Sequence, residues 1–486
     1  MKYIQDSSLF IQAAVIGDEY ITSPSSIPVF NPATGEVLGH IPNLSREECK
    51  RAILVAEKGF TTWKQIPAKE RSKILKEWFR LVMQNQEDLA FILTQEQGKP
   101  LTEARGEIAY AASYIEWFSE EAKRVYGDVI PSHRFDTRIL ILKEPVGVVA
   151  TITPWNFPSA MLARKVAAAL AVGCSVVSKP SELTPFSALA LHKLALKAGL
   201  PSGVWNIVMG DYVEIGKEFC ENPIVKKISF TGSTQTGALL MAQSASTVKR
   251  LSLELGGNAP FIVFEDADID KAVRGAILSK YRNSGQTCVC VNRFYVQESI
   301  AEEFSRKLAH KSAQLKVGNG LEEGVEQGPL INLKAVEKVE THIEDALAKG
   351  AKLLCGGKRH HLGNNFFEPT VLYGIHSNMQ ICQEETFGPV SGIQTFQTEQ
   401  EVLRLANHTP YGLAAYFYSK DVSRIWRIAE GLEVGMIGIN EAIISSEQIP
   451  FGGVKQSGFG REGSKYGIED YLNLKYLCIG LESYKE

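Results

Sequence analysis

Apolar residues in the first part of the chain recur at the three- and four-residue spacing of amphipathic helices. After a short strand-rich start, Ser45-Arg46-Glu47-Glu48 fits a capping box, and the apolar side chains that follow recur at helical spacing. A second helix is predicted around residues 74–82. A third is predicted from about Leu101 to Val125, because Gly98-Lys99-Pro100 breaks the chain before it. The first 125 residues are therefore expected to be mainly helical.

From Val146 to Glu254 the pattern becomes a strict alternation of short apolar strands with helices. Strands are predicted at GVVATI, CSVVSKP, VWNIVM, KKISF and RLSLEL. Such alternation predicts right-handed βαβ crossovers and a parallel sheet, which binds ligands beyond the carboxyl ends of its strands. The segments TPWNFP, KPSE, FTGSTQTG and ELGG follow these strands, so they are the expected ligand-binding loops.

A second alternation begins after Gly256-Gly257 and continues to IGIN at residues 437–440. We therefore expect an α/β fold with two doubly wound, Rossmann-like parallel-sheet domains and a small β element. The expected ranges are 1–125 with 146–255 for the first domain, 256–467 for the second, and 126–145 with 468–486 for the β element. The apolar run Arg138–Leu142 is expected to be free to pair with the edge of another subunit.

Composition narrows the possible functions. The 486 residues are 44% hydrophobic and 22% charged, which is typical of a globular protein. The net charge of −3 provides no basic field for nucleic acid or anionic lipid, and no apolar run is long enough to span a membrane. The N-terminus lacks a signal-peptide pattern, and the eight cysteines lack disulfide-framework spacing, so we expect reduced thiols and a cytoplasmic protein.

Cys288 is the candidate nucleophile, because the preceding Gly285-Gln286-Thr287 predicts a polar turn rather than an apolar face. The nine histidines show neither a nucleophile–base signature nor metal-ligand spacing, so no metal site is predicted. Glu254 ends an apolar strand, where desolvation would raise the pKa of its carboxyl group toward the range useful for proton abstraction. The alternatives are a structural thiol at Cys288 and a buried ion-pair partner at Glu254.

Two of the expected loops suggest a dinucleotide. FTGSTQTG at residues 230–237 opens a helix, whose N-terminal N–H groups would stabilise a pyrophosphate. Its glycine spacing differs from GxGxxG, so an ordinary Gly-rich turn is equally compatible. Lys179-Pro180-Ser181-Glu182 follows another strand of the same sheet, and its charged side chains would bond ribose hydroxyls or remain solvated. Two such loops at one sheet edge together favour a dinucleotide.

The motifs, taken in order, resemble those of the NAD(P)-dependent aldehyde dehydrogenase family over essentially the whole chain. The matching segments are TPWNFP at 153–158, FTGSTQTG at 230–237, LELGGN at 253–258, GQTC at 285–288, EETFGP at 384–389 and PFGG at 450–453. CVCVNR and the C-terminal SKYGIEDYLNLKYLCIG are most similar to the succinate-semialdehyde dehydrogenase subgroup. The resemblance implies an NAD(P)-binding domain, a catalytic domain, an oligomerisation β element, and a homodimer or homotetramer.

The resemblance also implies a role for each site residue. Cys288 would attack the aldehyde, the Asn156 amide and the Cys288 backbone N–H would hold the oxyanion, and Glu254 would activate the water that hydrolyses the thioester. The residues implied in cofactor binding are Trp155, Asn156, Lys179, Pro180, Ser181, Glu182, Gly232, Ser233, Leu255, Glu385 and Phe387. A catalytically silent NAD-binding protein would lack these catalytic groups, and a thiol acyltransferase would not need the dinucleotide loops.

The expected substrate is an aldehyde with a distal carboxylate, which a guanidinium anchors best. Arg164 and Arg282 match the carboxylate-binding arginines of the subgroup, and Ser445 matches its third contact, with a surface salt bridge as the alternative for either arginine. The implied reaction is oxidation of succinate semialdehyde to succinate. Glutarate semialdehyde and broad-range aliphatic aldehydes are the alternative substrates, since one methylene provides only about 1–3 kcal/mol of discrimination.

Two further residues refine the expectation. Glu182 would accept a hydrogen bond from the 2′-hydroxyl of NAD and repel the 2′-phosphate of NADP, so NAD is expected over NADP. Lys179 still leaves NADP use possible. Cys290 is expected to form a reversible disulfide with Cys288 under oxidation, with a packing thiol as the alternative.

Overall fold

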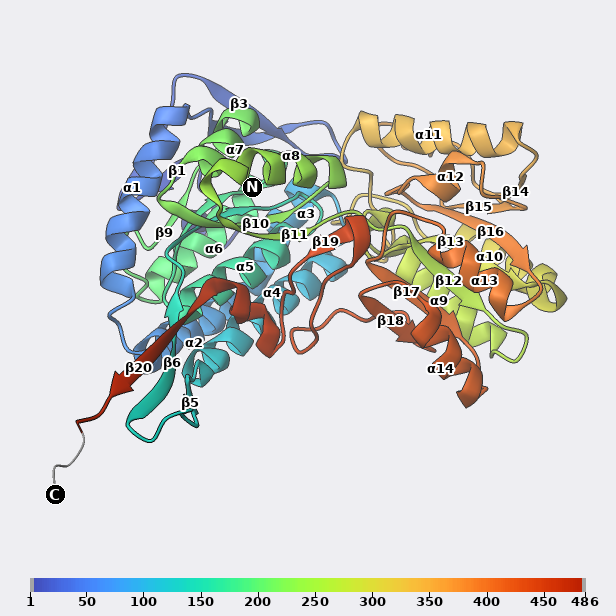
Figure 1. Cartoon of the computed structure of the whole chain (residues 1–486). Coiled ribbons are helices and arrows are strands. Elements are labelled where there is room, and N and C mark those ends of the chain that lie inside the picture. Colours follow the sequence, from blue (N-terminus) through green and yellow to red (C-terminus); the bar gives the residue numbers. More distant parts are fainter. Residues whose placement is uncertain (1–3, 483–486) are drawn as a thin grey trace.

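The computed structural model describes residues 4–482, which fold into two α/β lobes and a short β arm (Figure 1). Within these residues the first lobe is built on an eight-stranded sheet and the second on a seven-stranded sheet. The predicted α/β fold with two parallel-sheet domains is therefore confirmed. The extreme ends of the expected domain ranges, residues 1–3 and 483–486, lie outside the described residues.

The first sheet combines a parallel core with antiparallel strands at both edges. Its strands are β1 (Ala14–Ile16), β2 (Glu19–Ile21), β7 (Val148–Ile152), β8 (Ser175–Lys179), β9 (Trp205–Ile207), β10 (Val225–Thr231), β11 (Arg250–Glu254) and β19 (Gly458–Phe459). They lie in the order β19-β11-β10-β7-β8-β9-β1-β2. The chain winds outward from β7 on one side and from β10 on the other, so the topological switch point lies between these two strands.

Helices pack around this sheet, and the predicted capping box begins the first of them. They are α1 (Arg46–Trp63), α2 (Ala68–Gln84), α3 (Gln86–Gln97), α4 (Leu101–Glu121), α5 (Pro158–Val172), α6 (Pro185–Lys197), α7 (Tyr212–Glu221) and α8 (Thr234–Ser244). Ser45 and Glu48 form the reciprocal cap, as predicted, whereas the helix predicted to reach Val125 ends at Glu121. Helix α5 is buried around its whole circumference, including the charged Arg164 and Lys165.

The second sheet is parallel except at one edge. Its strands are β12 (Ala259–Val263), β13 (Val291–Gln297), β14 (Lys352–Cys355), β15 (Thr370–Tyr373), β16 (Val390–Phe396), β17 (Ala414–Tyr418) and β18 (Met436–Ile439), in the order β14-β15-β16-β13-β12-β17-β18. The accompanying helices are α9 (Ile269–Tyr281), α10 (Ala301–Ala313), α11 (Leu333–Ala348), α12 (Gln380–Gln383), α13 (Glu399–Asn407) and α14 (Val422–Gly431). The 3₁₀ helices of the whole chain are η1 (Ser7–Leu9), η2 (Ala122–Arg124), η3 (Ala245–Thr247), η4 (Arg282–Gly285), η5 (Glu298–Ile300), η6 (Lys455–Ser457) and η7 (Lys465–Tyr471).

The C-terminal part of the chain returns from the second lobe to the first. Strand β19 belongs to the range expected for the second domain, yet it pairs antiparallel with β11 of the first sheet, with Gly458 opposite Glu254. This crossing brings the segment after β19 against helix α5, where Glu462 contacts Lys165. The two lobes are thus joined by chain segments that the order of elements does not reveal.

The β arm consists of β5 (Asp128–Ile130), β6 (Thr137–Pro145) and β20 (Leu472–Gly480), in the order β20-β6-β5, and a separate hairpin is formed by β3 (Ser26–Phe30) and β4 (Val37–Pro42). The expectation that residues 138–142 are free to pair with another subunit is wrong for most of this run. Residues 139–141 are hydrogen-bonded to β20 on one side and to β5 on the other, so β20 presents the long free edge. Among residues 4–482, no helix has the length and apolar character that crossing a membrane requires.

Candidate active site

A cavity of about 380 Å³ opens at the switch point of the first sheet and is lined by residues of both lobes. The predicted site residues that line it are Trp155, Asn156, Gly232, Ser233, Leu255, Cys288, Glu385 and Phe387. The loops meet here because β7, β8, β10 and β11 end side by side, with Ile152 opposite Lys179 and Thr231 opposite Glu254. The candidate nucleophile and the candidate cofactor loops therefore share one cavity.

Cys288 lies in the turn between η4 and β13 and is only partly exposed to the cavity. Asn283 and Ser284 adopt left-handed φ values of 51° and 58°, which reverse the chain just before the nucleophile. Burial raises the pKa of the Cys288 thiol to about 12, although the Arg164 guanidinium acts to lower it. The free thiol is therefore protonated near neutral pH, and its reaction requires that a proton be removed.

Asn156 follows β7 and reaches the turn that carries Cys288. Its Nδ2 atom donates a hydrogen bond to the Gln286 carbonyl at 3.0 Å, which fixes the direction of the amide. Its Oδ1 atom is buried without a hydrogen-bond partner among the described residues. The second N–H of the amide has no acceptor within that same part of the chain, so it is available to a ligand oxygen in the cavity.

Glu254 is buried at the end of β11, and neither of its carboxylate oxygens has a hydrogen-bond partner within residues 4–482. Burial raises the pKa of Glu254 well above its usual value, and the nearby Glu462 raises it further. The cations of Arg164 and Lys165 pair with Glu462 rather than with Glu254. The geometry thus favours a proton acceptor over an ion-pair partner at Glu254.

The segment 385–387 forms the opposite wall of the cavity. Glu385 accepts a hydrogen bond from the Gly257 N–H at 3.2 Å, and Lys338 of α11 donates to the Glu385 carbonyl at 2.5 Å. Burial raises the pKa of the Glu385 carboxyl to about 7. Phe387 stands edge-on to Trp155 at 5.5 Å between ring centroids, so this pair joins the two lobes across the cavity.

Lys179 ends β8 and Glu182 lies three residues beyond it, and neither lines the Cys288 cavity. Lys179 Nζ lies 3.1 Å from Glu182 Oε2. Burial raises the pKa of Glu182, but the Lys179 ammonium outweighs it, so the net shift is downward. Pro180 and the buried Ser181 connect Lys179 to Glu182. The lowered pKa of Glu182 means that an ionised carboxylate stands just after the strand.

The groups at this edge of the sheet fit a dinucleotide. Ser233 caps α8 by accepting from the Thr236 N–H at 3.2 Å, so the helix N-terminus faces the switch point, where it favours an anion. Gly256 lines the cavity, and a Cβ there would lie 3.1 Å from Glu385 Oε2. A side chain would therefore fill the space beside a carboxylate that is able to accept ribose hydroxyls.

The three predicted substrate-binding residues are not all together. Arg282 and Ser445 line one small enclosed cavity, and the Arg282 guanidinium lies 5.4 Å from the ring centroid of Phe157, directly after Asn156. Arg164 lies apart from them, fully buried against Glu462. Its Nη1 and Nη2 atoms have no hydrogen-bond partner in the described part of the chain. Arg164 is therefore not a surface ion pair, and two of its donor atoms remain unused.

Cys290 does not line the cavity that Cys288 enters. Its sulfur is buried 3.4 Å from Lys280 Nζ, and it donates to the Val291 carbonyl at 3.3 Å. Both cysteines are free thiols. The packing of Cys290 means that a disulfide with Cys288 requires rearrangement of the turn.

Several buried charged residues beside the site were not predicted from the sequence. They are Lys99, Glu107, Lys165, Lys280 and Glu462. For Lys165 a signal was present in the sequence, because Arg164 and Lys165 stand together in the otherwise apolar segment AMLARKVAAALAV. Buried cations require anionic partners, so this pair indicates that a carboxylate packs against the helix. Nothing near Glu462 in the sequence identifies it as that partner, because 297 residues separate it from Lys165.

Comparison with known proteins agrees with this geometry. The model of the Aldehyde dehydrogenase family matches residues 20–477. The chain is 55% identical to succinate-semialdehyde dehydrogenase (NADP(+)) GabD of Escherichia coli, over 98% of this chain and 100% of the relative. It is 56% identical to a glutarate-semialdehyde dehydrogenase of Pseudomonas putida, over the same shares of both chains.

The fold also matches solved structures along its length. The crystal structure of succinate-semialdehyde dehydrogenase from Burkholderia pseudomallei superposes with a TM-score of 0.98 at 59% identity, covering 99% of this chain and 100% of that chain. Family model, relatives and structure all extend over both lobes and the β arm. The chain therefore belongs to the aldehyde dehydrogenase family, and it is an NAD(P)-dependent oxidoreductase that acts on an aldehyde.

Proposed function

We propose that this enzyme oxidises succinate semialdehyde to succinate and prefers NAD. The observation that carries the proposal is the Arg282–Ser445 cavity, which is also lined by Val289, directly after Cys288. The Arg282 guanidinium lies over Phe157, directly after Asn156. A guanidinium without an ion-pair partner in the described residues matches a distal carboxylate. The relatives named for succinate and glutarate semialdehydes also act on aldehydes of this class.

In the proposed reaction the Cys288 sulfur adds to the aldehyde carbon as the thiol loses its proton, which gives a thiohemiacetal. The Asn156 amide and the Cys288 backbone N–H donate to the oxyanion; one such donor is typically worth about 10²–10³ in rate. A bound NAD or NADP supplies the hydride acceptor, which leaves a thioester on Cys288. Glu254 then takes a proton from the water that attacks this thioester. The C–S bond breaks, the acid product leaves and ionises to its carboxylate in solvent, and the proton on Glu254 returns to sulfur, which restores the Cys288 thiol.

The cofactor is proposed to lie along the edge where the parallel strands end. Gly232 and Ser233 at the start of α8 would bind the pyrophosphate, Glu385 the nicotinamide ribose, and Lys179 with Glu182 the adenosine ribose. Trp155, Pro180, Ser181, Leu255 and Phe387 would complete the contacts. We expect Glu182 to favour NAD, because its ionised carboxylate would repel a 2′-phosphate.

The NAD preference is tested by kcat/KM with each cofactor for the wild type and for Glu182→Ser. The wild type should favour NAD, and the substitution should shift the ratio toward NADP by about tenfold or more, since it removes the repulsion but keeps Lys179. The Escherichia coli relative is named for NADP(+), which makes this measurement decisive. An NADP preference in the wild type would refute the proposal.

The anchor is tested with succinate semialdehyde and butanal, which have the same chain length but differ in the carboxylate. Arg282→Gln should lower kcat/KM for succinate semialdehyde by about 10- to 100-fold, the loss of one charge-assisted pair, and should leave butanal within a few fold. Arg164→Gln should act in the same direction, since two of its donor atoms are unused. Equal losses on both aldehydes would count against the anchor.

Glutarate semialdehyde is the second candidate, because a relative that is 56% identical is named for it. Its additional methylene needs a deeper pocket between the anchor and Cys288. The ratio of kcat/KM for the two semialdehydes decides between them, and a ratio that favours glutarate semialdehyde would reassign the substrate.

The β arm is proposed to hold the enzyme as a homodimer or homotetramer. Strand β20 has a free edge and exposes Leu474 and Tyr476. Exposed apolar side chains on an unpaired strand favour association with another chain. Light scattering on a size-exclusion column should give the mass of two or four chains, and a monomer for Leu474→Glu with Tyr476→Glu.

The Cys288–Cys290 disulfide remains a prediction. Peroxide would accept two electrons and two protons from the thiols, which would join as a disulfide while the peroxide is reduced to water. Inactivation by peroxide should then be reversed by dithiothreitol in the wild type, and this reversible part should be lost in Cys290→Ala. Unchanged reversibility in that variant would exclude the switch.

A further inference from the structure

Lys99 and Glu107 form an ion pair that is completely shielded from solvent. Lys99 stands between α3 and α4, and Glu107 lies on α4. The Lys99 Nζ atom lies 2.6 Å from Glu107 Oε2, and both side chains have no exposed surface. Removing two charges from water costs several kcal/mol per ion, and an apolar pair of similar volume is often as stable. The presence of such a pair therefore calls for a reason other than stability.

The remaining hydrogen bonds of this pair all go to one short segment, residues 156–160. Lys99 Nζ donates to the Asn156 carbonyl at 2.8 Å. The other carboxylate oxygen of Glu107 accepts from the backbone N–H groups of Ser159 and Ala160, at 2.9 and 3.3 Å. The pair thus binds Asn156, near the end of the loop that joins β7 to α5, and the first turn of α5 directly after it.

Asn283 holds the same carbonyl from the other lobe. Its Nδ2 atom donates to the Asn156 carbonyl at 2.9 Å and to the Gln286 carbonyl at 3.2 Å. Gln286 is also the acceptor for the Asn156 side chain. Asn283 adopts a left-handed φ of 51°, which an asparagine tolerates better than most residues. One side chain therefore sets the spacing between the Asn156 backbone and the turn that carries Cys288.

We propose that Lys99, Glu107 and Asn283 are positioning residues that hold the Asn156 amide where it meets the oxyanion formed on Cys288. The inference rests on the proposed function, in which Asn156 is that donor. A buried cation on the Asn156 carbonyl and a buried carboxylate on the Ser159 and Ala160 N–H groups restrict the movement of this loop. Such rigidity matters because a displacement of about 1 Å in a catalytic group costs up to about 10²-fold in rate.

The test compares the rates of two reactions of Cys288, both measured without cofactor. One reaction forms an oxyanion and the other does not. Acylation by p-nitrophenyl acetate forms a tetrahedral oxyanion, whereas alkylation by iodoacetamide does not. Lys99→Met and Glu107→Gln should slow acylation by about 10- to 100-fold and leave alkylation within about twofold. Equal slowing of both reactions, or of neither, would overturn the proposal.

Two control variants replace other fully buried ionisable side chains elsewhere. Glu96 is fully buried and accepts from two backbone N–H groups at the start of α6, as Glu107 does at α5. Lys227 is fully buried beside Ser252 and Tyr471 on β10. Glu96→Gln and Lys227→Met should both leave the ratio of acylation to alkylation unchanged. A similar change of that ratio in the controls would mean that any buried charge produces the effect.

A double-mutant cycle with Asn156→Ala distinguishes this inference from the proposed function. If Asn156→Ala does not slow acylation, the proposed role of Asn156 fails. If Asn156→Ala slows acylation, adding Lys99→Met should slow it by no more than about a further twofold, because both substitutions act through the Asn156 amide. Independent, multiplying losses would overturn the positioning role. Should the Lys99 variant not fold, Asn283→Gly provides the same cycle, since glycine accepts the left-handed φ.

Discussion

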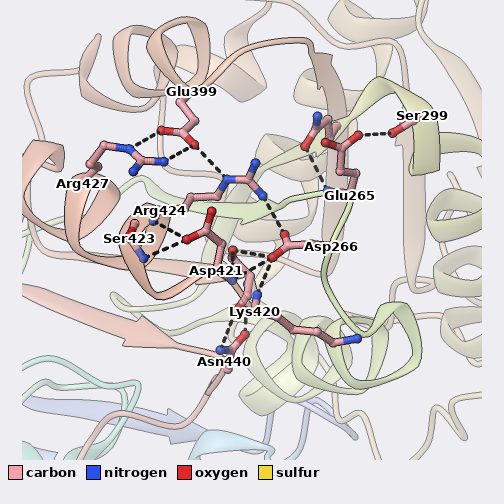
Figure 2. A network of polar contacts seen from close by, with 12 residues as sticks. Glu265, Asp266, Ser299, Glu399, Lys420, Asp421, Ser423, Arg424, Arg427 and Asn440 are labelled. Carbon is pink, nitrogen blue, oxygen red and sulfur yellow. Dashed lines mark hydrogen bonds and ion pairs between the residues drawn. The ribbon is translucent and has the colours of Figure 1, made fainter.

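Two polar clusters lie at strand ends of the two sheets, and they differ in how their hydrogen-bonding groups are satisfied. Beyond β12 and β17 in the second lobe, Asp266 accepts from Ser419 Oγ, from the Lys420 and Asp421 N–H groups, and from Arg424 at 2.8 Å (Figure 2). Arg424 also binds Glu399, as Figure 2 shows. Each carboxylate of this cluster has partners, and the pKa of Asp266 is held below its usual value despite partial burial.

The cluster around Cys288, to which both lobes contribute, has the opposite character. Glu254 has two unpartnered carboxylate oxygens, Asn156 one unpartnered oxygen and Arg164 two unpartnered terminal nitrogens, all counted within residues 4–482. The pKa of Glu254 is raised by burial, whereas the pKa of Glu399 is lowered to about 2, mainly by its hydrogen bond from Arg427. Buried groups without partners are costly, so they persist where a ligand or a reaction uses them.

The contrast separates two reasons for charged side chains at a sheet edge. The cluster around Asp266 fastens the loops after β12 and β17, and the Asp266 and Glu399 carboxylates are each held by several donors. The Cys288 cluster lowers stability and retains reactive groups. Replacing a carboxylate should therefore lower stability in the Asp266 cluster and lower catalysis in the Cys288 cluster.

The largest expected effect is that of Glu254→Gln. Loss of the proton acceptor should lower steady-state turnover by about 10²–10⁴-fold, with a burst of one reduced cofactor per active site, because hydrolysis of the thioester is blocked. The free energy of unfolding should not fall by more than about 1 kcal/mol, since the amide replaces an unpartnered acid. The matched Glu399→Gln should keep kcat/KM within about twofold. A large activity loss in Glu399→Gln would break the comparison.

Asp266→Ala should have the next largest effect, on stability alone. It leaves the Lys420 and Asp421 N–H groups and the Arg424 guanidinium without their acceptor, at a cost of about 2–3 kcal/mol in the free energy of unfolding. Denaturant titration monitored by fluorescence measures the loss, and kcat/KM at a permissive temperature should be unchanged. Wild-type stability in Asp266→Ala would contradict the structural role of this cluster.

A pH dependence of NAD affinity is expected from Glu385. Burial raises the pKa of its carboxyl to about 7, so the ionised form becomes dominant as the pH rises from 6 to 8, and in the proposed binding mode this form would accept from both ribose hydroxyls. The Kd for NAD should fall by up to about tenfold over that range. Titration calorimetry at several pH values measures this trend, which should be absent in Glu385→Gln. The same slope in the variant would assign the titration to another group.

The smallest expected effect is an acid-sensitive contribution from Glu399. Its pKa is lowered to about 2, so its stabilisation is fully present above about 4.5 and is lost as the pH falls toward 2. We expect about 1 kcal/mol, because Arg427 is more than half exposed and solvent screens the pair. The difference in Tm between wild type and Glu399→Gln should narrow from pH 6 to pH 3. A difference that is constant over this range would exclude the ion pair as its cause.

The local pattern was sufficient to predict much of the fold. The period of two in the strands and 3.6 in the helices predicted the alternation around both sheets, and the capping box at Ser45 and Glu48 is present. The loops after β7, β8 and β10 could be placed at one edge, because parallel strands between crossover helices all end on the same side. Glu254 and Cys288 were recognisable as candidates because each stands in a setting unusual for its residue type.

The sequence determined the family, the α/β architecture and the reactive groups at strand ends, since these depend on neighbours along the chain. Only the tertiary structure decided which partners those groups have. It placed Gly458 beside Glu254, Glu462 against Arg164, and Lys99 on the carbonyl of Asn156. Each of these contacts joins residues far apart in the chain, and it arises from how buried surfaces pack, which no local periodicity records.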